Sequence, residues 1–537
     1  MSRVVVVGWD GATWSVARPL VQQGRLPVLA SLCKGGAQGT LRSVPNMNSA
    51  PAWSTIATGL DPGRHGIFYF DEPVPGTYRR SVLNAARRNG ASLWRMASDA
   101  GKRIVVVNVP ISYPVEPING VQVAGLDAPF TTAPGFSYPQ DLTQRYPDVF
   151  AGYIIEPGAQ SAVRAGRIQE AKDQLLRAIG GWVSLTARLM QDEAWDLVFV
   201  VFTSSDIAQH FFWAGEGYPF IERVYEAQDE ATGRLVDLAR SQDPDVNIVV
   251  LADHGGAANS RGPEFIPIWL EDQGLLVWTP PPVRSRLLAA GFRVANRTLT
   301  RNQKLALARR FPRLRQQAEA EARLAGVDWR RTRAYADGRR DEVLLNLAGR
   351  EPEGTVDPGD YEAVGRELKE LITSIRELDT GRPLVDSVLL REEAYRGPHV
   401  ERAPDLTVRW VLDGPARGFE CRSSDGRARM HAVAARAPLQ SGGHHPEGLF
   451  VANGPDVLPT DVRGELADVT PTLMTLLGAP VPAGLDGRPL DVLKGGVSTA
   501  PPEVTVPGAA VAESPSSGYS AEEEEEVRRR LEDLGYL

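Results

Sequence analysis

Four stretches of the chain are almost continuously apolar, and each has the length of a single strand: residues 3–9, 103–109, 196–203 and 246–252. Such runs are typical of parallel strands that are buried on both faces, because a strand with one exposed face alternates between apolar and polar residues. Between the runs, apolar residues follow helical spacing, most clearly over 165–193. The pattern predicts an α/β fold: a doubly wound, mostly parallel sheet with helices on both faces and its site at the carboxyl ends of the strands.

The second half of the chain changes in composition twice. Three consecutive prolines lead into Arg-rich sequence with helical spacing, which predicts a helical cap inserted into the fold. Its arginines either help to hold an anionic substrate or form a solvated helix face. Further along, a Gly-, Pro- and Ser-rich stretch predicts a flexible linker, and a Ser-x-x-Glu capping signal after it predicts a helix. We therefore divide the chain into a catalytic domain (1–280 and 328–492), the helical cap insertion (281–327), the flexible linker (493–518) and a C-terminal helix (519–537).

Composition and charge narrow the class of protein. Apolar residues make up 42% of the 537 residues and charged residues 23%, as in an ordinary soluble globular protein. The net charge of -8 comes without a basic stripe, which argues against extended nucleic acid as a partner. Two cysteines are too few for a disulfide framework or a thiolate zinc site.

The first residues bear on the location of the protein. The chain opens directly on a predicted strand, without the basic segment and longer apolar run of a signal peptide. Its apolar runs all fall short of the roughly 20 residues that a membrane span needs. We therefore expect a cytoplasmic protein without a membrane span, and the sequence does not indicate its oligomeric state.

Carboxylates and imidazoles follow three of the four predicted strands. Asp10 comes directly after the first strand, and the pair Asp253 and His254 comes directly after the fourth. Asp206 and His210 follow the third strand four residues apart, so a helix that begins there would place both side chains on one face. Because carboxylate oxygens and imidazole nitrogens together suit Zn²⁺ and similar ions, these residues predict a divalent metal site. The alternatives are structural: the carboxylates cap helices, and the histidines face solvent.

Two further positions add to this set. Adjacent histidines, His444 and His445, occur far downstream in a chain that has only seven histidines in all. Ser49 lies in a turn-rich segment, just before a helix that we expect to begin near Pro51 or Ala52. Because N–H groups at a helix N-terminus favour a phosphate or a developing oxyanion, Ser49 is a candidate nucleophile. The alternative is an ordinary N-cap serine.

Several of these segments resemble one known family. Residues 49–67, SAPAWSTIATGLDPGRHGI, resemble the nucleophile segment of the alkaline phosphatase superfamily in its type I phosphodiesterase / nucleotide pyrophosphatase branch. The opening VVVVGWDGAT resembles the first metal-binding strand of that family, and the Asp-x-x-x-His and Asp-His-Gly motifs match at 206–210 and 253–255. The family's later histidine, which precedes a Gly-aliphatic strand start, matches His444 better than His445. The resemblance covers most of residues 3–490.

The resemblance implies a mechanism and a ligand set. Ser49 would attack phosphorus and form a covalent phosphoserine intermediate that water then hydrolyses. Two divalent metal ions would lie on either side of the phosphoryl group. Zn²⁺ is the expected metal, although Mn²⁺ or Fe would also suit these ligand atoms. Asn89 would donate a hydrogen bond to a phosphoryl oxygen, although Asn-Gly is also a common turn dipeptide. The implied ligands are Asp206, His210 and His444 for one metal ion, and Asp10, Asp253, His254 and the Ser49 oxygen for the other.

The resulting hypothesis is a metal-dependent hydrolase that cleaves phosphodiester or pyrophosphate bonds of a small-molecule phosphate ester, such as a nucleotide. The alternative within the same chemistry is a phosphomonoesterase, phosphonate hydrolase or phosphomutase, because the nucleophile is Ser49 where the nucleotide pyrophosphatases typically have threonine. A dinucleotide-binding protein is disfavoured, since GWDGAT lacks the G-x-G-x-x-G spacing. A non-catalytic binding protein is also disfavoured, because all seven site residues are present.

Overall fold

The structure is a computed structural model, and it describes residues 2–279, 324, 326–422, 428–432, 440–494 and 518–537. The predicted cap insertion, 281–327, therefore lies outside the described residues except for its last positions. The predicted linker, 493–518, lies outside them except for its ends. Among the described helices, none combines the length and apolarity needed to cross a membrane.

A nine-stranded sheet forms the centre of the molecule. Its middle strands are mutually parallel, and only β19 and β7 run antiparallel to their neighbours. All four predicted strands lie in this parallel part, which confirms the predicted mostly parallel α/β sheet. The order is β20 (Asp461–Glu465), β2 (Ala37–Arg42), β19 (Glu447–Asn453), β9 (Asn247–Leu251), β1 (Val4–Trp9), β8 (Leu197–Phe202), β5 (Ile104–Val109), β6 (Gly120–Ala124) and β7 (Ser137–Tyr138).

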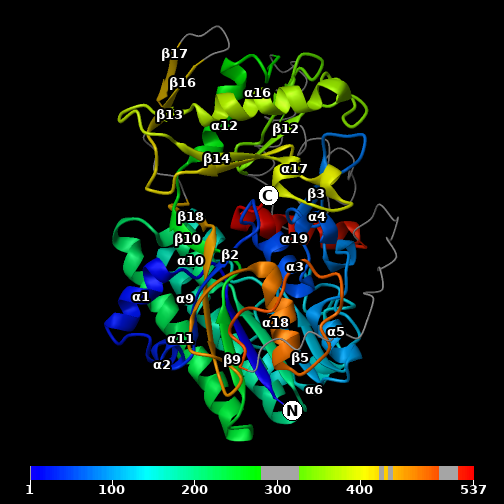
Figure 1. The fold of residues 1–537 in the computed structure, drawn as a ribbon, viewed down its shortest axis with the longest axis vertical. Helices are drawn as coiled ribbons and strands as arrows, with labels where there is room; N and C mark the ends of the chain where they lie inside the picture. The colour runs from blue at the N-terminus through cyan, green and yellow to red at the C-terminus, as the bar shows by residue number, and fades with distance from the viewer. Residues whose placement is uncertain (1, 280–323, 325, 423–427, 433–439, 495–517) are drawn as a thin grey trace.

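Burial on both faces explains why these strands are continuously apolar. In β1, Val5 and Val7 belong to the core on one face of the sheet, while Val4 and Val6 belong to the core on the other. Each valine that is fully buried in this way contributes roughly 1.5–3 kcal/mol. Helices cover both faces, as Figure 1 shows. One layer contains α1 (Trp14–Gln22), α2 (Pro27–Cys33), α9 (Ile168–Asp192), α10 (Ser204–Phe212) and α11 (Tyr218–Gln242), and the other contains α3 (Ser49–Thr58), α5 (Leu93–Asp99) and α18 (Val469–Leu476).

A second subdomain, α12 through β17, has a hydrophobic core of its own and lies above the large sheet in Figure 1. We place residues 328–492 in the catalytic domain together with 1–280, and within the described part of that stretch β18 (Gly442–His445), β19, β20 and α18 pack with the sheet part. The strands before them are short and lie in separate sheets. The subdomain comprises α12 (Gly262–Asp272), the sheet β11 (Ala334–Tyr335), β12 (Glu342–Leu345), β15 (Leu406–Trp410) and β14 (Val385–Leu390), the helix α16 (Tyr361–Thr373), and the sheet β13 (Arg376–Glu377), β16 (Gly418–Arg422) and β17 (Ala428–Ala432).

A buried carboxylate connects the two parts. Asp71 in β3 (Asp71–Pro73) accepts hydrogen bonds from Arg80 Nε and from Arg340 Nη2 of the subdomain, both at 2.8 Å. Burial works to raise the pKa of Asp71, but the two guanidinium groups outweigh it and hold this pKa well below its usual range. The carboxylate therefore stabilises the fold at neutral pH and loses that contribution only as the pH falls below the ordinary aspartate range.

We expect the Asp71→Ala variant to lose roughly 3–5 kcal/mol of its free energy of unfolding, because the buried Arg340 would lose the carboxylate to which it is hydrogen-bonded. The matched control is Asp99→Ala, which breaks the Arg95–Asp99 pair, whose side chains are 43% and 61% exposed. Exposed pairs contribute about 0–1 kcal/mol. Chemical denaturation of both variants measures the difference. Equal losses would contradict a stabilising role for the buried pair.

Candidate active site

The predicted ligands meet at the carboxyl end of the parallel strands, in the region between the sheet and the subdomain. Asp10 directly follows β1, and Asp253 and His254 follow β9. Asp206 lies in the first turn of α10, which follows β8. Because β8, β1 and β9 are neighbours in the sheet, the residues after them are brought together. Asp10, Asp206, Asp253 and His254 are all at most 2% exposed.

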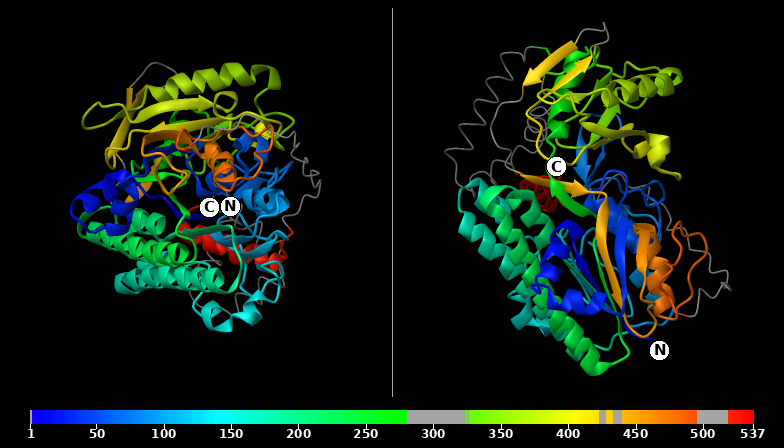
Figure 2. Two further views of the ribbon diagram at one scale, coloured as in Figure 1. Left: turned by 60° about the horizontal axis from the view of Figure 1, so that its bottom comes forward. Right: turned by 60° about the vertical axis from the view of Figure 1, so that its left-hand side comes forward.

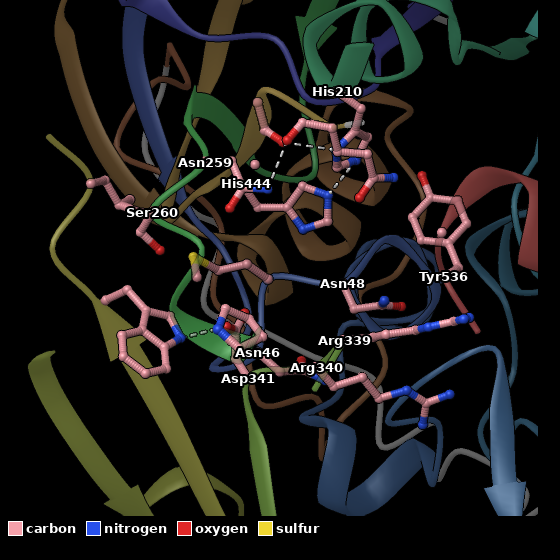
Figure 3. A pocket seen from close by; sticks show the side chains of 18 of the residues that line it. Asn46, Asn48, His210, Asn259, Ser260, Arg339, Arg340, Asp341, His444 and Tyr536 are labelled. Atoms are coloured by element: carbon pink, nitrogen blue, oxygen red, sulfur yellow. Dashed lines mark hydrogen bonds between the residues drawn. The ribbon is translucent and has the colours of Figure 1, made fainter. Parts of the chain in front are cut away.

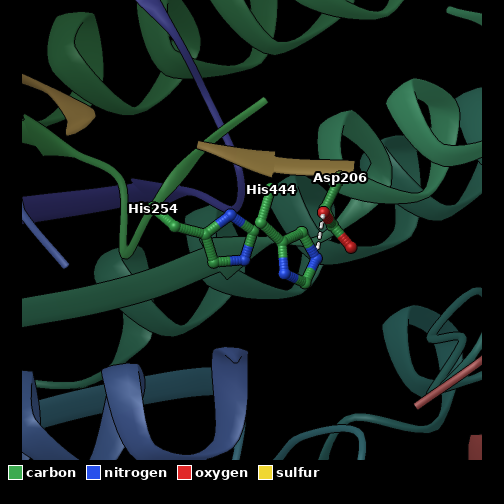
Figure 4. Close-up of side chains that lie close together, drawn as sticks. All are labelled: Asp206, His254 and His444. Atoms are coloured by element: carbon green, nitrogen blue, oxygen red, sulfur yellow. Dashed lines mark ion pairs between the residues drawn. The ribbon is translucent and has the colours of Figure 1, made fainter. Parts of the chain in front are cut away.

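One group of side chains surrounds Asp206. His210 lies one helical turn further along α10, and its Nε2 is 3.3 Å from Asp206 Oδ2. His444 Nε2 is 3.0 Å from His210 Nε2 and 3.6 Å from Asp206 Oδ1 (Figure 4). The helix expected after the third strand is therefore present, and it places both ligands on one face.

The structure places His444, and not His445, in this group. Strand β18 pairs with β10 (Gly255–Ala258), and successive side chains of a strand point to opposite faces. His444 consequently faces the site, and its ring centroid is 4.1 Å from that of His254. His445 instead accepts a hydrogen bond on Nδ1 from the Glu447 N–H at 3.1 Å.

A second group surrounds His254 Nε2. This atom is 3.7 Å from Asp10 Oδ1, 3.4 Å from Asp253 Oδ2 and 3.2 Å from Ser49 Oγ. His254 Nδ1 lies 3.0 Å from the Gly255 carbonyl, which only accepts, so Nδ1 carries the proton in the neutral ring and Nε2 keeps its lone pair. The ligand atoms of Asp206, His254 and His444 form one close set, and those of Asp10, Asp253 and His254 form another, so that His254 belongs to both.

The oxygen and nitrogen atoms that this second group directs at one another are suited to bind a cation. Within the described part of the chain, Asp10 Oδ1 and Asp253 Oδ2 are buried without a hydrogen-bond donor. Burial, reinforced by the charges of Asp253 and Asp206, raises the pKa of Asp10 well above its usual range. Burial also raises the pKa of Asp253. Buried carboxylate oxygens that face one another and an imidazole lone pair are costly unless a positive charge lies among them.

The other oxygens of these two carboxylates are held by the protein. Trp53 Nε1 donates to Asp10 Oδ2 at 2.9 Å, and the Gly11 N–H donates to Asp253 Oδ1 at 3.1 Å. Each carboxylate is thus oriented through one oxygen and presents the other to the site. Asp10 does not cap the following helix, because the N-cap residue of α1 is Thr13.

Ser49 is the first residue of α3, two positions earlier than the helix start that we expected. The N-cap is Asn48, whose side-chain oxygen accepts from the Ala50 N–H at 3.1 Å. We expected the helix to begin later because both Asn48 and Ser49 are residue types that commonly cap a helix N-terminus. As a result, the Ser49 hydroxyl is not used for capping and is directed at His254 from the N-terminal end of α3.

Two further residues near α3, His65 and the predicted Asn89, lie apart from the predicted metal ligands. His65 is the last residue of α4 (Pro62–His65) and is fully buried; its Nε2 contacts Thr55 Oγ1 of α3 at 3.0 Å, and its Nδ1 accepts the Ile67 N–H, so it joins the turn after α4 to α3. Asn89 donates its backbone N–H to the His65 carbonyl at 2.9 Å. In the described part of the chain, no hydrogen bond or ion pair joins Asn89 to the other predicted site residues, and its role stays a prediction.

A cavity of about 130 Å³ opens beside the predicted metal ligands and is shown in Figure 3. The sheet side contributes His210 and His444, and the subdomain contributes Arg339 and Asp341. Its lining includes the amide side chains of Asn46, Asn48 and Asn259. The cavity is therefore in contact with two of the predicted metal ligands and with polar side chains of both parts of the molecule.

The sequence did not point to Tyr536, which also lines this cavity. Its hydroxyl donates to Asp206 Oδ2 at 2.7 Å. The capping signal at Ser520 predicts a C-terminal helix, but the Gly-Tyr-Leu that follows the helix carries no motif. Only its contact in the folded chain identifies Tyr536.

Comparisons with known proteins found one matching family and several solved structures of similar fold. A family model of type I phosphodiesterase / nucleotide pyrophosphatase matches residues 4–414. Phosphonoacetate hydrolase from Sinorhizobium meliloti, solved with phosphonoformate, is 17% identical, with a TM-score of 0.52 over 89% of this chain and 95% of that one. Murine ectonucleotide pyrophosphatase / phosphodiesterase 5, solved as an inactive variant with AMP, is 13% identical, with a TM-score of 0.47 over 89% and 96%. No curated protein sequence matches. At 17% identity, the likeness to the hydrolase shows the fold alone.

Proposed function

Because the chain belongs to the type I phosphodiesterase / nucleotide pyrophosphatase family of the alkaline phosphatase superfamily, we propose that it cleaves phosphodiester or pyrophosphate bonds in a small-molecule phosphate ester through a phosphoserine intermediate. Membership makes the protein a phosphoric ester hydrolase; the bond, the intermediate and the substrate are our proposal. One observation carries it. The Ser49 hydroxyl lies 3.2 Å from His254, the imidazole shared by both groups of candidate metal ligands.

The residues of the site fit two divalent cations, and the mixed oxygen and nitrogen donors favour Zn²⁺ over Mg²⁺ or Ca²⁺. When bound, such cations supply positive charge that lowers the pKa of a coordinated hydroxyl and stabilises the leaving oxygen. Asp206, His210 and His444 would hold one cation. Asp10, Asp253, His254 and the Ser49 oxygen would hold the other.

The protein's own groups would carry the displacement. Ser49 Oγ would attack phosphorus as its proton passes to solvent; the bond from phosphorus to the leaving oxygen would break, that oxygen would leave as an alcohol or phosphate group, and a phosphoserine would form. The N-terminal end of α3, where Ser49 lies, would favour the negative charge of the phosphoryl oxygens. Water then attacks the same phosphorus and releases Ser49. In this scheme the Asn89 side chain would donate a hydrogen bond to a phosphoryl oxygen.

A substrate panel on the purified protein tests the proposed bond. We expect kcat/KM for an aryl phosphodiester, or for a nucleotide with a pyrophosphate bond, to exceed that for the matching aryl monoester by at least about tenfold, a difference of roughly 1.4 kcal/mol in transition-state binding. The reverse order would contradict phosphodiesterase activity and favour a phosphomonoesterase.

A phosphonate hydrolase is the second candidate. The chain shares a fold with phosphonoacetate hydrolase over 95% of that enzyme, and its predicted nucleophile is Ser49 in place of the threonine typical of nucleotide pyrophosphatases. Phosphonoacetate belongs in the panel for this reason. Preferred cleavage of its carbon–phosphorus bond would replace the first proposal with the second. Transfer of a phosphoryl group from one position to another of the same substrate, without release of phosphate, would indicate a phosphomutase.

A further inference from the structure

The C-terminal segment is anchored to the same core as the metal ligands. Helix α19 (Ala521–Leu534) begins with a capping box between Ser520 and Glu523. Three of its apolar side chains, Val527, Leu531 and Leu534, belong to the core that covers one face of the large sheet. In Figure 1 and in the right view of Figure 2, this helix lies at the junction between the sheet and the subdomain.

Polar contacts fix the helix at its far end as well. The buried Arg530 donates to the carbonyls of Leu126, Ala128 and Pro129, which belong to a loop of the sheet part. Gln440, two residues before β18, donates to the Leu534 carbonyl at 3.1 Å. These bonds use groups that would otherwise be buried without partners, so the segment is an integral part of the fold.

The chain then turns so that Tyr536 enters the site. Gly535 has φ 85°, a left-handed conformation that glycine adopts without strain, and it ends the helix. The ring of Tyr536 packs on Phe70 with a centroid distance of 4.8 Å, and the side chain is 8% exposed. Arg339 of the subdomain donates to the main-chain oxygen of Leu537. The tyrosine is therefore held on both sides.

The hydroxyl of Tyr536 reaches a predicted metal ligand directly. It lies 2.7 Å from Asp206 Oδ2, and because an ionised carboxylate only accepts, the phenol is the donor. The same carboxylate faces His210 and His444, so the hydroxyl bonds Asp206 alongside those two ligands. Figure 3 shows Tyr536 directed toward His210 at the edge of the cavity.

We propose that Tyr536 is a positioning residue that orients Asp206 for metal binding. The C-terminal segment would thereby contribute to the metal site. This inference rests on the proposed metal site. Hydrogen-bond partners of metal ligands fix the orientation of those ligands, and their loss typically costs 10–100-fold in metal affinity or activity. The anchors of α19 hold Tyr536 in place beside Asp206.

The test compares Tyr536→Phe with Tyr519→Phe. The first variant removes the hydroxyl and keeps the ring on Phe70. The second is a matched control, because Tyr519 lies in the same segment, stacks on Tyr113 and donates its hydroxyl to the Asp127 carbonyl at 2.6 Å, away from the ligands. Zn²⁺ affinity is measured by competition with a chromophoric chelator, and the Co²⁺-substituted proteins are compared by visible absorption.

We expect Tyr536→Phe to bind one of its two Zn²⁺ ions about 10–100-fold more weakly than the wild type, with a changed Co²⁺ spectrum, and Tyr519→Phe to match the wild type. Saturating Zn²⁺ should restore much of the turnover of Tyr536→Phe. Two ions bound at wild-type affinity would overturn the inference, as would faster turnover with unchanged affinity, which would identify a blocking residue. A wild-type protein that binds no metal would instead refute the proposed function itself.

Discussion

The Ser49→Ala variant is expected to lose at least about four orders of magnitude in kcat while it keeps its fold and its metal content. Removing the nucleophile of a hydrolase that works through a covalent intermediate leaves only the catalysis from binding and electrostatic stabilisation. The fold should remain because Asn48, and not Ser49, caps α3. Turnover on an aryl phosphodiester, metal analysis and circular dichroism measure the three quantities.

A control for this variant lies in the same helix. Ser54 is also buried in α3, and its hydroxyl donates to the Ala50 carbonyl at 2.7 Å instead of facing the ligands. Ser54→Ala should therefore keep turnover near that of the wild type. Undiminished hydrolysis by Ser49→Ala would remove Ser49 from the mechanism, and equal losses in both variants would show that the loss comes from disturbing α3.

Removing the metal ions is expected to abolish turnover and to lower the thermal stability as well. Without a cation, Asp10 Oδ1 and Asp253 Oδ2 remain buried without a donor and face the lone pair of His254. A ligand that binds the folded state alone stabilises it by about 2.7 kcal/mol at one hundred times its Kd. Dialysis against a chelator, followed by calorimetry and activity assays, measures both effects, and added Zn²⁺ should restore both.

The Ser49→Ala variant also separates the two consequences of metal loss. It has almost no activity to lose, yet the chelator should still lower its melting temperature, because the carboxylates and imidazoles are intact. A wild-type protein that stays active and equally stable after complete removal of metal would contradict a metal-dependent mechanism.

The sequence predicted the centre of the fold because its strands are buried on both faces. The continuous valines of β1 exclude an exposed face and also fix the position of Asp10, at the end of the strand. The four-residue spacing of Asp206 and His210 predicted a shared helix face, and the structure has that helix. Where one strong local pattern determines the structure, the sequence was sufficient.

The second subdomain was not predicted, because its strands are short and partly exposed. β14 has a mixed burial pattern, and β11 has only two residues. Elements of this kind take their place from partners far along the chain, such as the pairing of β12 with β15. Local periodicity does not reveal such partners.

Tyr536 shows the same limit at the site itself. It lies 330 residues from Asp206 along the chain, and the contact depends on the docking of α19 and the turn at Gly535. No spacing or motif encodes that approach. His444 also lies far from Asp206 along the chain, but the family pattern marked it, whereas nothing comparable marks Tyr536.

The most direct test of the account is an anomalous-scattering map of a crystal of the wild-type protein, grown with Zn²⁺ and measured at the zinc absorption edge. The account predicts two peaks beside Ser49, one among Asp206, His210 and His444 and the other among Asp10, Asp253 and His254. A protein that is crystallised in excess Zn²⁺ and shows no peak among these six side chains would contradict it.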